Sequence, residues 1–363
     1  MPTPPPLRRA ARRIRRRVVT AVLGTLIGVA TVAAPARAEM TGVTGQRDAA
    51  DMTEYPITTT PDGFPAGITT GPDGALWFAE SGTNRIGRIT TAGTVTDHAT
   101  PSSDGAPFDL VLGPDDALWF TEPGAARIGR ITAFGAVTEF PLPRADSVPL
   151  GITRGPDDAL WFTEQNANRI GRISTRGSIG EFAVPTPDSH PYTIAAGADG
   201  ALWFTELTSG KIGRITVSGR ITEFALPGDD DCPRDIVAGP GGMWFTASGS
   251  NSVNRISASG HLTRFPLPHP DSGPDGIALG PDGRIWFAEQ AGRIGRLAPG
   301  GRAADRITEF PVPTGADRVP FQITTGPDHA LWFTEAVGNA VGHVRVTARR
   351  PRGNDTALPA RGR

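Results

Sequence analysis

All seven tryptophans of the 363-residue chain lie in copies of one short phrase, and this repeat limits the possible folds more than any other feature. The phrase reads ALWFTE or a close variant, including GMWFTA in the fifth copy and RIWFAE in the sixth. Successive tryptophans are 41 or 42 residues apart, except the last two, which are 46 apart. A period of this length indicates an array of similar supersecondary units. The tryptophans are Trp77, Trp119, Trp161, Trp203, Trp244, Trp286 and Trp332.

Each repeat contains four short segments with the β-branched and aromatic composition of strands. In order they read P-x-x-I-T, L-W-F-T-E, R-I-G-R-I and V-T-E-F-P, and turns rich in Gly, Pro and Asp separate them. A single four-stranded sheet of this length cannot bury both of its faces, whereas seven sheets packed around an axis each gain two neighbours. The sequence therefore predicts an all-β fold, a seven-bladed β-propeller with four antiparallel strands per blade.

The two ends of the array predict how the ring closes. The seventh repeat provides P-F-Q-I-T, L-W-F-T-E and A-V-G-H-V-R-V but lacks a fourth segment. Residues 52–57, MTEYPI, precede the first repeat and read like a fourth segment. We therefore expect this N-terminal strand to complete the last blade and to remove a free sheet edge. The propeller is expected to cover residues 51–346.

The repeated side chains predict how the blades pack. We expect the Trp-Phe pairs and the R-I-G-R-I strands to lie between blades, where the glycine allows close contact of the sheets. A glutamate ends the tryptophan phrase in six repeats, and we interpret it as architectural, paired with the arginine of R-I-G-R-I. These glutamates are Glu80, Glu122, Glu164, Glu206, Glu289 and Glu335.

Residues 1–38 have the features of an export signal. Arginines concentrated in residues 8–17 precede an apolar run over residues 18–34, and Ala36-Arg37-Ala38 fits cleavage after Ala38. The alternative is an uncleaved membrane anchor, although the apolar run is short for a membrane span. We expect residues 39–50 to be a linker and residues 347–363 to be a disordered tail. The sequence thus predicts a secreted or extracytoplasmic protein, exported by the general or the twin-arginine route.

The charge and cysteine content exclude some classes of partner. Removal of residues 1–38 takes away eight of the 36 basic residues and none of the 37 acidic ones, which leaves a net charge near −9. This balance argues against nucleic acid as a partner. No second apolar stretch is long enough to cross a membrane. The one cysteine, Cys232, excludes an internal disulfide, and we expect a monomer.

The phrases GITTGPDGALWFAE, NRIGRIT and ITEFPLP resemble the repeats of the virginiamycin B lyase (streptogramin lyase) family of seven-bladed propellers. The resemblance covers roughly residues 51–346. It implies the activity of that family, which opens the lactone ring of type B streptogramins by elimination with the help of Mg²⁺. This implication depends on whether the chain keeps the residues that the family uses.

The matching positions hold other residues. The resemblance implies a Pro-His pair at the start of the first strand in each of the last two repeats, one histidine binding the metal and the other acting as the base. Here these pairs read Pro274-Asp275 and Pro320-Phe321. The elimination needs a base that titrates near neutral pH, and phenylalanine is not one. Further family positions, two glutamates and a tyrosine, correspond to Val319, Ala336 (with Glu335 one residue earlier) and Ala66.

The loops at the start of the first strands converge at the mouth of the central channel, so they supply our candidates for ligand binding. Asp109, Asp235 and Asp275 can alternatively be a cation site, or the residues are simply solvated, with Arg234 neutralising nearby aspartates. We name Asp275 and His190 as the candidates for a catalytic role, and we identify no metal ligand set. The candidates for ligand binding are Phe108, Asp109, Tyr192, Arg234, Asp235, Asp275, Phe321 and Gln322.

Two functions remain open. In the first, the chain is a secreted propeller without streptogramin lyase activity that binds a small molecule or a protein at the channel mouth, or a protein on the faces of the ring, and we identify no cofactor for it. In the second, it is a carbon–oxygen lyase that linearises type B streptogramins with Mg²⁺, or a related lactone-acting enzyme whose site lies around Asp275. The missing Pro-His pairs favour the first.

Overall fold

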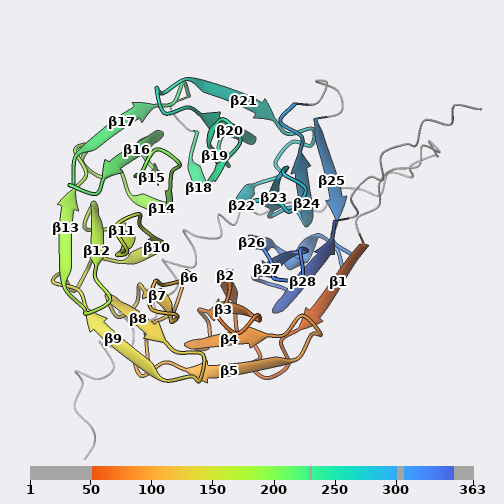
Figure 1. Ribbon diagram of the computed structural model, residues 1–363. Helices are drawn as coiled ribbons and strands as arrows, with labels where there is room; N and C mark the ends of the chain where they lie inside the picture. Colours follow the sequence, from red (N-terminus) through yellow and green to blue (C-terminus); the bar gives the residue numbers. More distant parts are fainter. Residues whose placement is uncertain (1–50, 229–230, 301–305, 347–363) are drawn as a thin grey trace, which may run out of the picture.

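The computed structural model describes residues 51–228, 231–300 and 306–346 of the chain. The expected signal, linker and tail lie outside the described residues. Seven four-stranded antiparallel sheets are arranged as blades around a central axis, which confirms the predicted seven-bladed β-propeller (Figure 1). In each blade the first strand lies nearest the axis and the fourth lies at the periphery.

The strands follow the repeat along the chain. Blades 1 to 4 comprise β2 (Pro65–Thr70), β3 (Leu76–Glu80), β4 (Arg85–Ile89) and β5 (Val95–Ala99); β6 (Leu110–Leu112), β7 (Leu118–Glu122), β8 (Arg127–Ile131) and β9 (Val137–Pro141); β10 (Pro149–Arg154), β11 (Leu160–Glu164), β12 (Arg169–Ile173) and β13 (Ile179–Ala183); and β14 (Pro191–Ala196), β15 (Ala201–Glu206), β16 (Lys211–Thr216) and β17 (Ile221–Ala225). Blades 5 and 6 comprise β18 (Pro233–Gly239), β19 (Gly242–Ala247), β20 (Ser252–Ile256) and β21 (Leu262–Pro266); and β22 (Pro274–Leu279), β23 (Ile285–Glu289), β24 (Arg293–Leu297) and β25 (Ile307–Pro311). Blade 7 comprises β26 (Pro320–Thr325), β27 (Leu331–Glu335), β28 (Ala340–Arg345) and β1 (Asp51–Pro56), and the 3₁₀ turn η2 (Ala316–Arg318) precedes it.

The ring closes as the sequence predicts. Strand β1 pairs antiparallel with β28, with Asp51 opposite Arg345 and Pro56 opposite Ala340 (Figure 1). Tyr55 of β1 also stacks on Trp332, with ring centroids 5.7 Å apart. The last blade is therefore assembled from both ends of the described chain, and the edge of β28 is covered.

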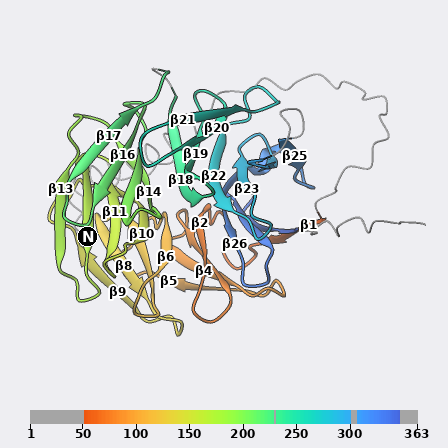
Figure 2. The same ribbon diagram turned by 45° about the horizontal axis from the view of Figure 1, so that its top comes forward.

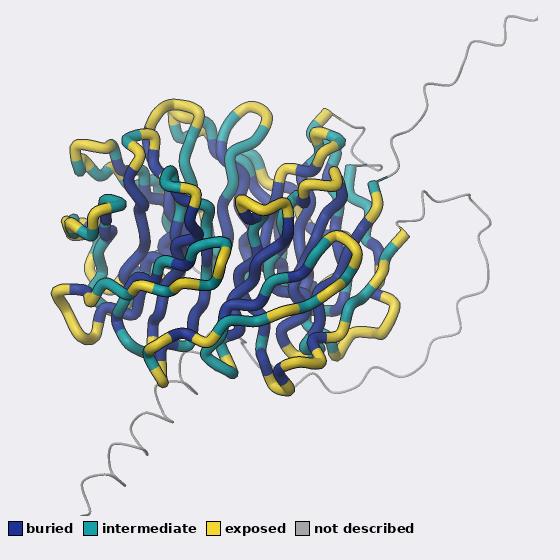
Figure 3. The backbone as a smooth tube through the Cα atoms, turned by 60° about the horizontal axis from the view of Figure 1, so that its bottom comes forward, coloured by how far each residue is buried: buried dark blue, intermediate teal, exposed yellow. Residues whose placement is uncertain are grey.

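The core lies between the blades, where the tryptophans are almost completely buried. Trp161 illustrates the repeated arrangement: its indole N–H donates to Asp157 in the preceding turn at 2.9 Å, and its ring stacks on Phe182 at 5.5 Å. The second arginine of R-I-G-R-I, here Arg172, forms an ion pair with the same aspartate at 2.7 Å. In Figure 3 the buried residues lie along the strands, and the exposed ones concentrate at the turns on the two faces of the ring.

The expected pairing of the phrase-ending glutamates with the first arginine of R-I-G-R-I is wrong. Arg127 faces Glu122 across the strand pair, but its ion pair is with Glu139 on the fourth strand, at 3.2 Å. Because the Arg127 side chain points outwards, its guanidinium stays partly hydrated. This costs less free energy than burying the charge beside Glu122. Arg85, Arg169 and Lys211 make the equivalent fourth-strand pairs with Asp97, Glu181 and Glu223.

We use the term mouth face for the face of the ring on which the first strands begin. It carries the connections from each fourth strand to the next first strand, and the turns between second and third strands. In the tilted view of Figure 2 the first strands β14, β18, β22 and β26 lie side by side around the axis. Among the described residues, no helix is long and apolar enough to cross a membrane.

Candidate functional site

A left-handed residue precedes the starting proline of every first strand, or its counterpart Pro107 just before β6. The φ angles of these seven residues lie between 43° at Cys232 and 59° at Gly273. Because side chains with a Cβ avoid this region, the entry into each blade is a sharp and costly turn. The chain then reverses from the rim of the mouth face towards the axis within one residue. Six of the seven positions are not glycine: Phe64, Ala106, Val148, His190, Cys232 and Val319.

The residues that follow the first-strand prolines converge on the axis. Phe108, Tyr192 and Phe321 are almost fully buried and belong to one apolar cluster together with Ala66 and Leu150. The ring of Phe108 lies 5.9 Å from that of Phe321 and 6.1 Å from that of Tyr192. The aromatic candidates from blades 2, 4 and 7 therefore fill the channel with side chains.

The cavity that remains on the axis has a volume of about 10 Å³. It is lined by seven of the eight candidate residues, all but Arg234, together with Gly67 and Thr193. A cavity of this size holds about one water molecule, whereas sites for small ligands usually enclose several hundred cubic ångströms. The structure thus brings the candidates together but leaves no room for a ligand among them.

Asp109 and Asp235 join neighbouring blades. Each carboxylate accepts the N–H of the next residue in its own blade and one N–H of the following blade: Ile152 donates to Asp109 at 3.0 Å and Ile277 to Asp235 at 2.9 Å. Burial raises the pKa of Asp109 to about 6 and that of Asp235 to about 7, although these N–H groups favour the ionised form. The carboxylate oxygens of Asp109 and Asp235 on the axis are thus already used in hydrogen bonds that join neighbouring blades.

Asp275 lies in a buried polar cluster beside the aromatic one. Its Oδ2 accepts a hydrogen bond from Gln290 Nε2 at 2.8 Å and lies 4.0 Å from Arg234 Nη1. The guanidinium of Arg234 lies over the ring of Tyr192, 5.6 Å from its centroid. Burial raises the pKa of Asp275, while Arg234 and Gln290 oppose that rise. Arg234 therefore neutralises the carboxylate in place, and both side chains are largely withdrawn from solvent.

His190 is half-buried at the rim of the mouth. Its Nδ1 lies 3.0 Å from the carbonyl oxygen of Asp188 and 3.0 Å from the hydroxyl of Thr208. A carbonyl only accepts hydrogen bonds, so this contact favours a proton on Nδ1 and leaves Nε2 as the basic nitrogen. His190 directly precedes the first strand of blade 4, but it does not line the cavity on the axis.

The other histidines have structural partners elsewhere. His98 stacks on Trp77, His269 pairs with Glu309 at the periphery, and His343 Nε2 lies 3.1 Å from Asp328 near the opposite face. His261 and His329 lie in turns on that opposite face. Within the described ranges, no three carboxylate, imidazole or thiol groups are arranged to hold a metal ion.

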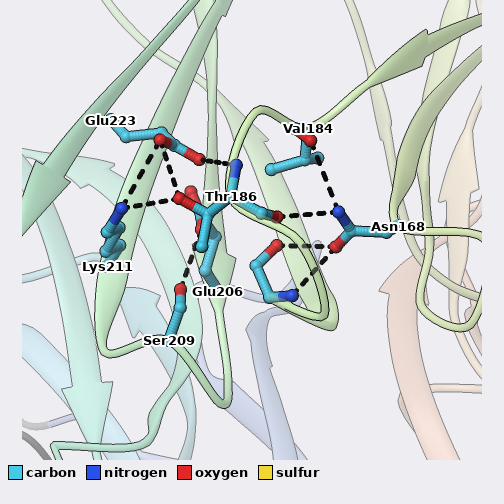
Figure 4. Close-up of polar contacts among 8 residues, drawn as sticks. Asn168, Val184, Thr186, Glu206, Ser209, Lys211 and Glu223 are labelled. Atoms are coloured by element: carbon cyan, nitrogen blue, oxygen red, sulfur yellow. Dashed lines mark hydrogen bonds and ion pairs between the residues drawn. The ribbon is translucent and has the colours of Figure 1, made fainter.

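The connections on the mouth face are held by a repeated side-chain device, which we call the asparagine clamp. Asn168 donates from Nδ2 to the carbonyl of Thr186 at 2.8 Å and accepts at Oδ1 from the backbone N–H of Ser189 at 3.0 Å (Figure 4). Thr186 in turn donates through its N–H and hydroxyl to Glu223, which pairs with Lys211 (Figure 4). Asn84, Asn251 and Asn339 clamp the equivalent connections in blades 1, 5 and 7.

Blades 2, 4 and 6 lack the asparagine, and blade 2 borders a much larger cavity than the one on the axis. Ala126 occupies the clamp position, and beside it a cavity of about 800 Å³ opens on the mouth face between blades 2 and 3. Ser102 and Asp104 line one wall and Asp146 and Val148 the other. Sequence reasoning about the channel mouth missed this space, and the signal that could have found it was the alanine where four repeats have asparagine.

The fold and the mouth define a class of protein: a seven-bladed propeller whose first strands converge on a channel closed by side chains. The family model described as the Virginiamycin B lyase family matches residues 39–184 and 152–352 of this chain. The chain therefore belongs to the virginiamycin B lyase family. A comparison with curated protein sequences gives no match.

Solved structures agree with this membership. A streptogramin B lyase structure is 35% identical, with a TM-score of 0.77 over 82% of this chain and 98% of that one. Virginiamycin B lyase from Staphylococcus aureus is 37% identical, with a TM-score of 0.77 over 82% of this chain and 100% of that one. The same values hold for its catalytically inactive histidine-to-alanine variant with quinupristin. Hydrazine synthase from Kuenenia stuttgartiensis, at 18% identity and a TM-score of 0.66, shares the fold alone.

Proposed function

We propose that this chain is a member of the virginiamycin B lyase family that does not cleave streptogramins and instead binds a ligand or protein partner through its mouth face. The observation that carries the proposal is the set of side chains on the axis. Phe321 and Asp275 stand where the family resemblance implies histidines, and the first is packed against Phe108 while the second is bonded by Gln290. Neither supplies an imidazole that exchanges a proton near neutral pH.

The closed channel supports the same proposal. An elimination on a lactone needs the substrate to reach a base and an electrophile together, within hydrogen-bond distance of the reacting atoms. The space on the axis is about 10 Å³. The basic, apolar N-terminal segment supports an extracytoplasmic location for this activity, and we propose that the exported chain is a monomer.

Family membership favours a second candidate, a lyase acting on type B streptogramins or a related lactone. Relatives at 35% and 37% identity carry the names streptogramin B lyase and virginiamycin B lyase. In this reading Asp275 on the axis or His190 at the rim takes part in the chemistry, and a divalent ion such as Mg²⁺ would polarise the substrate there.

The experiment is a turnover assay. The exported form, beginning at Glu39, is incubated with quinupristin and Mg²⁺, and the linearised product is followed by liquid chromatography and mass spectrometry. The Staphylococcus aureus lyase serves as the positive control. We expect no product above the enzyme-free background, and product formation at a rate comparable to the control would overturn the proposal.

A second variant sharpens the result. Asp275→His with Phe321→His restores the two imidazoles, and the addition of Val319→Glu and Ala336→Glu restores the two glutamates that the family resemblance implies. We expect these changes to create measurable turnover only when all four are present, because base, metal ligands and orienting carboxylates act as a unit.

A further inference from the structure

The last blade differs from the others in the charges near its mouth-face end. In five blades a basic residue begins the third strand, next to the buried glutamate that ends the second strand and to an acid on the fourth. These bases are Arg85, Arg127, Arg169, Lys211 and Arg293. Blade 5 has neither the base nor the glutamate, with Ser252 and Ala247 in their places. Blade 7 alone keeps both acids and lacks the base.

The two acids of blade 7 are Glu335, at the end of β27, and Glu54, on β1. Ala340 begins β28 where five blades have the base, and it is opposite Glu335 on one side and Pro56 of β1 on the other. Glu335 is fully inaccessible to solvent, and no N–H or hydroxyl group donates to either of its oxygens. The carboxyl group of Glu54 lies within hydrogen-bonding reach of it. Two carboxyl groups therefore share this end of the blade.

The surroundings of the pair supply little positive charge. Arg318, in η2, is the cation that acts on Glu335, but its Nη1 donates to the carbonyl of Gly338 at 2.8 Å. Glu54 Oε1 accepts from the hydroxyl of Thr314 at 2.7 Å. Among the described residues, neither acid of the pair forms an ion pair with a base. The other titratable groups on β1, β28 and η2 are Asp51, Tyr55, Asp317, His343 and Arg345.

A proton makes this arrangement stable. Burial and the neighbouring Glu54 raise the pKa of Glu335 from 4.5 to about 8, and Arg318 offsets this only in part. At neutral pH the folded protein therefore keeps a proton on Glu335, which can donate to the carboxylate of Glu54 instead of repelling it. The contribution of this contact is fully present below pH 4.5 and is lost as the pH rises through about 8.

Strand β1 is the element that can respond to the loss of the proton. In the other blades the fourth strand follows the third along the chain, whereas no turn connects β1 to β28 (Figure 1). Strand pairing, the stack of Tyr55 on Trp332 and the bond from Thr314 to Glu54 hold it in place. We propose that a proton shared by Glu335 and Glu54 controls closure of the ring, so that β1 stays docked in acid and detaches in a growing fraction of molecules in mildly alkaline solution. This inference goes beyond the proposed function and holds whichever ligand the mouth face binds.

The test measures the opening of β1 by amide hydrogen exchange in the exported protein between pH 5.5 and 8.5. Mass spectrometry follows peptides that cover residues 51–57 and 340–346, and each observed rate is divided by the intrinsic exchange rate at that pH to give the opening equilibrium. We expect this equilibrium to rise by up to about tenfold per pH unit between pH 6 and 8, because opening releases one proton. Peptides from β9, whose blade is continuous and holds Glu122, should keep their protection.

Four variants assign the effect. Glu335→Gln keeps the shape of the protonated acid and should abolish the rise with pH. Glu54→Gln removes the facing charge and Ala340→Arg supplies the base found in five blades, and each should reduce the rise. Glu122→Gln, the matched change in a continuous blade, should leave the opening of β1 unchanged. The proposal is overturned by a wild-type opening equilibrium that does not change with pH, by a rise that Glu335→Gln leaves intact, or by an equal rise in β9.

Discussion

The buried glutamate of blade 2 gives a quantitative test of how the propeller handles charge. Glu122 is fully inaccessible to solvent, and neither of its carboxylate oxygens has a hydrogen-bond partner. Burial and the nearby charge of Glu139 raise its pKa to about 8 from 4.5, and Arg127, engaged by Glu139, offsets little of this. Glu122 is therefore expected to be protonated in the folded protein at neutral pH.

The sign of the effect on stability follows from proton binding. Between pH 4.5 and about 8 the folded state keeps a proton on Glu122 that the unfolded state has lost. Stability therefore falls as pH rises through this window, and the contribution is fully present only below pH 4.5. One such group changes the free energy of unfolding by about 1.4 kcal/mol per pH unit, or roughly 3 kcal/mol between pH 5.5 and 7.5.

The perturbation is Glu122→Gln, which keeps the shape of the protonated acid and removes the titration. We expect the variant to match the wild type within about 1 kcal/mol at pH 5.5 and to be more stable by roughly 2–3 kcal/mol at pH 7.5. Urea unfolding followed by tryptophan fluorescence at half-unit steps of pH gives both slopes. Parallel slopes for variant and wild type would refute the reasoning.

Blade 5 supplies a control of opposite sign. Ala247 stands at the glutamate position there, and the buried carboxylate is instead Asp231, which accepts from Arg264 at 2.6 and 2.8 Å. Removing this carboxylate leaves a partly buried guanidinium without its partner. We expect Asp231→Asn to destabilise the protein by roughly 2 kcal/mol at pH 7.5, whereas Glu122→Gln stabilises it.

Two further outcomes follow from the ends of the ring and from the missing clamp. Deletion of β1 exposes the edge of β28 and removes the stack of Tyr55 on Trp332. We therefore expect loss of cooperative unfolding and concentration-dependent aggregation in light scattering. A monomer with an unchanged urea midpoint would contradict the closure of the ring by β1. Ala126→Asn relieves strain at φ 51° and restores bonds to Arg144 and Ser147, so we expect a gain of about 1–2 kcal/mol in urea unfolding, with Ala126→Gly gaining less because it adds no bonds.

Much of the fold could be predicted because the information is local and repeated. The L-W-F-T-E and R-I-G-R-I phrases set strand register through paired positions such as Trp161 opposite Arg172, and the missing fourth segment of the last repeat predicted the role of β1. The partners of individual charges could not be predicted in this way. Glu122 and Arg127 are opposite in register, yet their side chains separate because one is buried and the other turns outwards to Glu139.

The site shows the same division. The sequence predicted that Phe108, Tyr192 and Phe321 come together, since all follow first-strand prolines. It could not predict that their rings meet at 5.9 and 6.1 Å and close the channel, because packing distance depends on blade tilt and on side-chain volume around the whole ring. The off-axis cavity was not predicted, because it is lined by loop residues from two neighbouring blades that carry no chemical motif.

Departures from the repeat differ in how far neighbouring contacts compensate for them. In blade 1 a Cβ on Gly87 would come within 2.6 Å of Glu80 Oε1 and 2.2 Å of Phe78. Blade 5 has Asn254 at this glycine position, together with Ala247 in place of the glutamate, and Asn254 donates to Ser252 at 3.0 Å. There the amide and the nearby Asp231–Arg264 pair replace the buried glutamate, although Asn254 Oδ1 stays buried without a hydrogen-bond partner.

Ala126 is compensated only in part. It keeps the left-handed backbone of the clamp position and forgoes the bonds that Asn84 and Asn168 make. The N–H and the hydroxyl of Ser147 instead both donate to the carbonyl of Arg144, at 3.3 and 2.9 Å. Natural sequences tolerate local inconsistencies of this kind mainly where function requires them. The strain at Ala126 lies beside a cavity of about 800 Å³ on the mouth face. Gly210 and Gly292 also lack the asparagine but adopt the left-handed backbone without strain, so Ala126→Asn is the substitution that tests whether strain and missing hydrogen bonds together cost stability at this position.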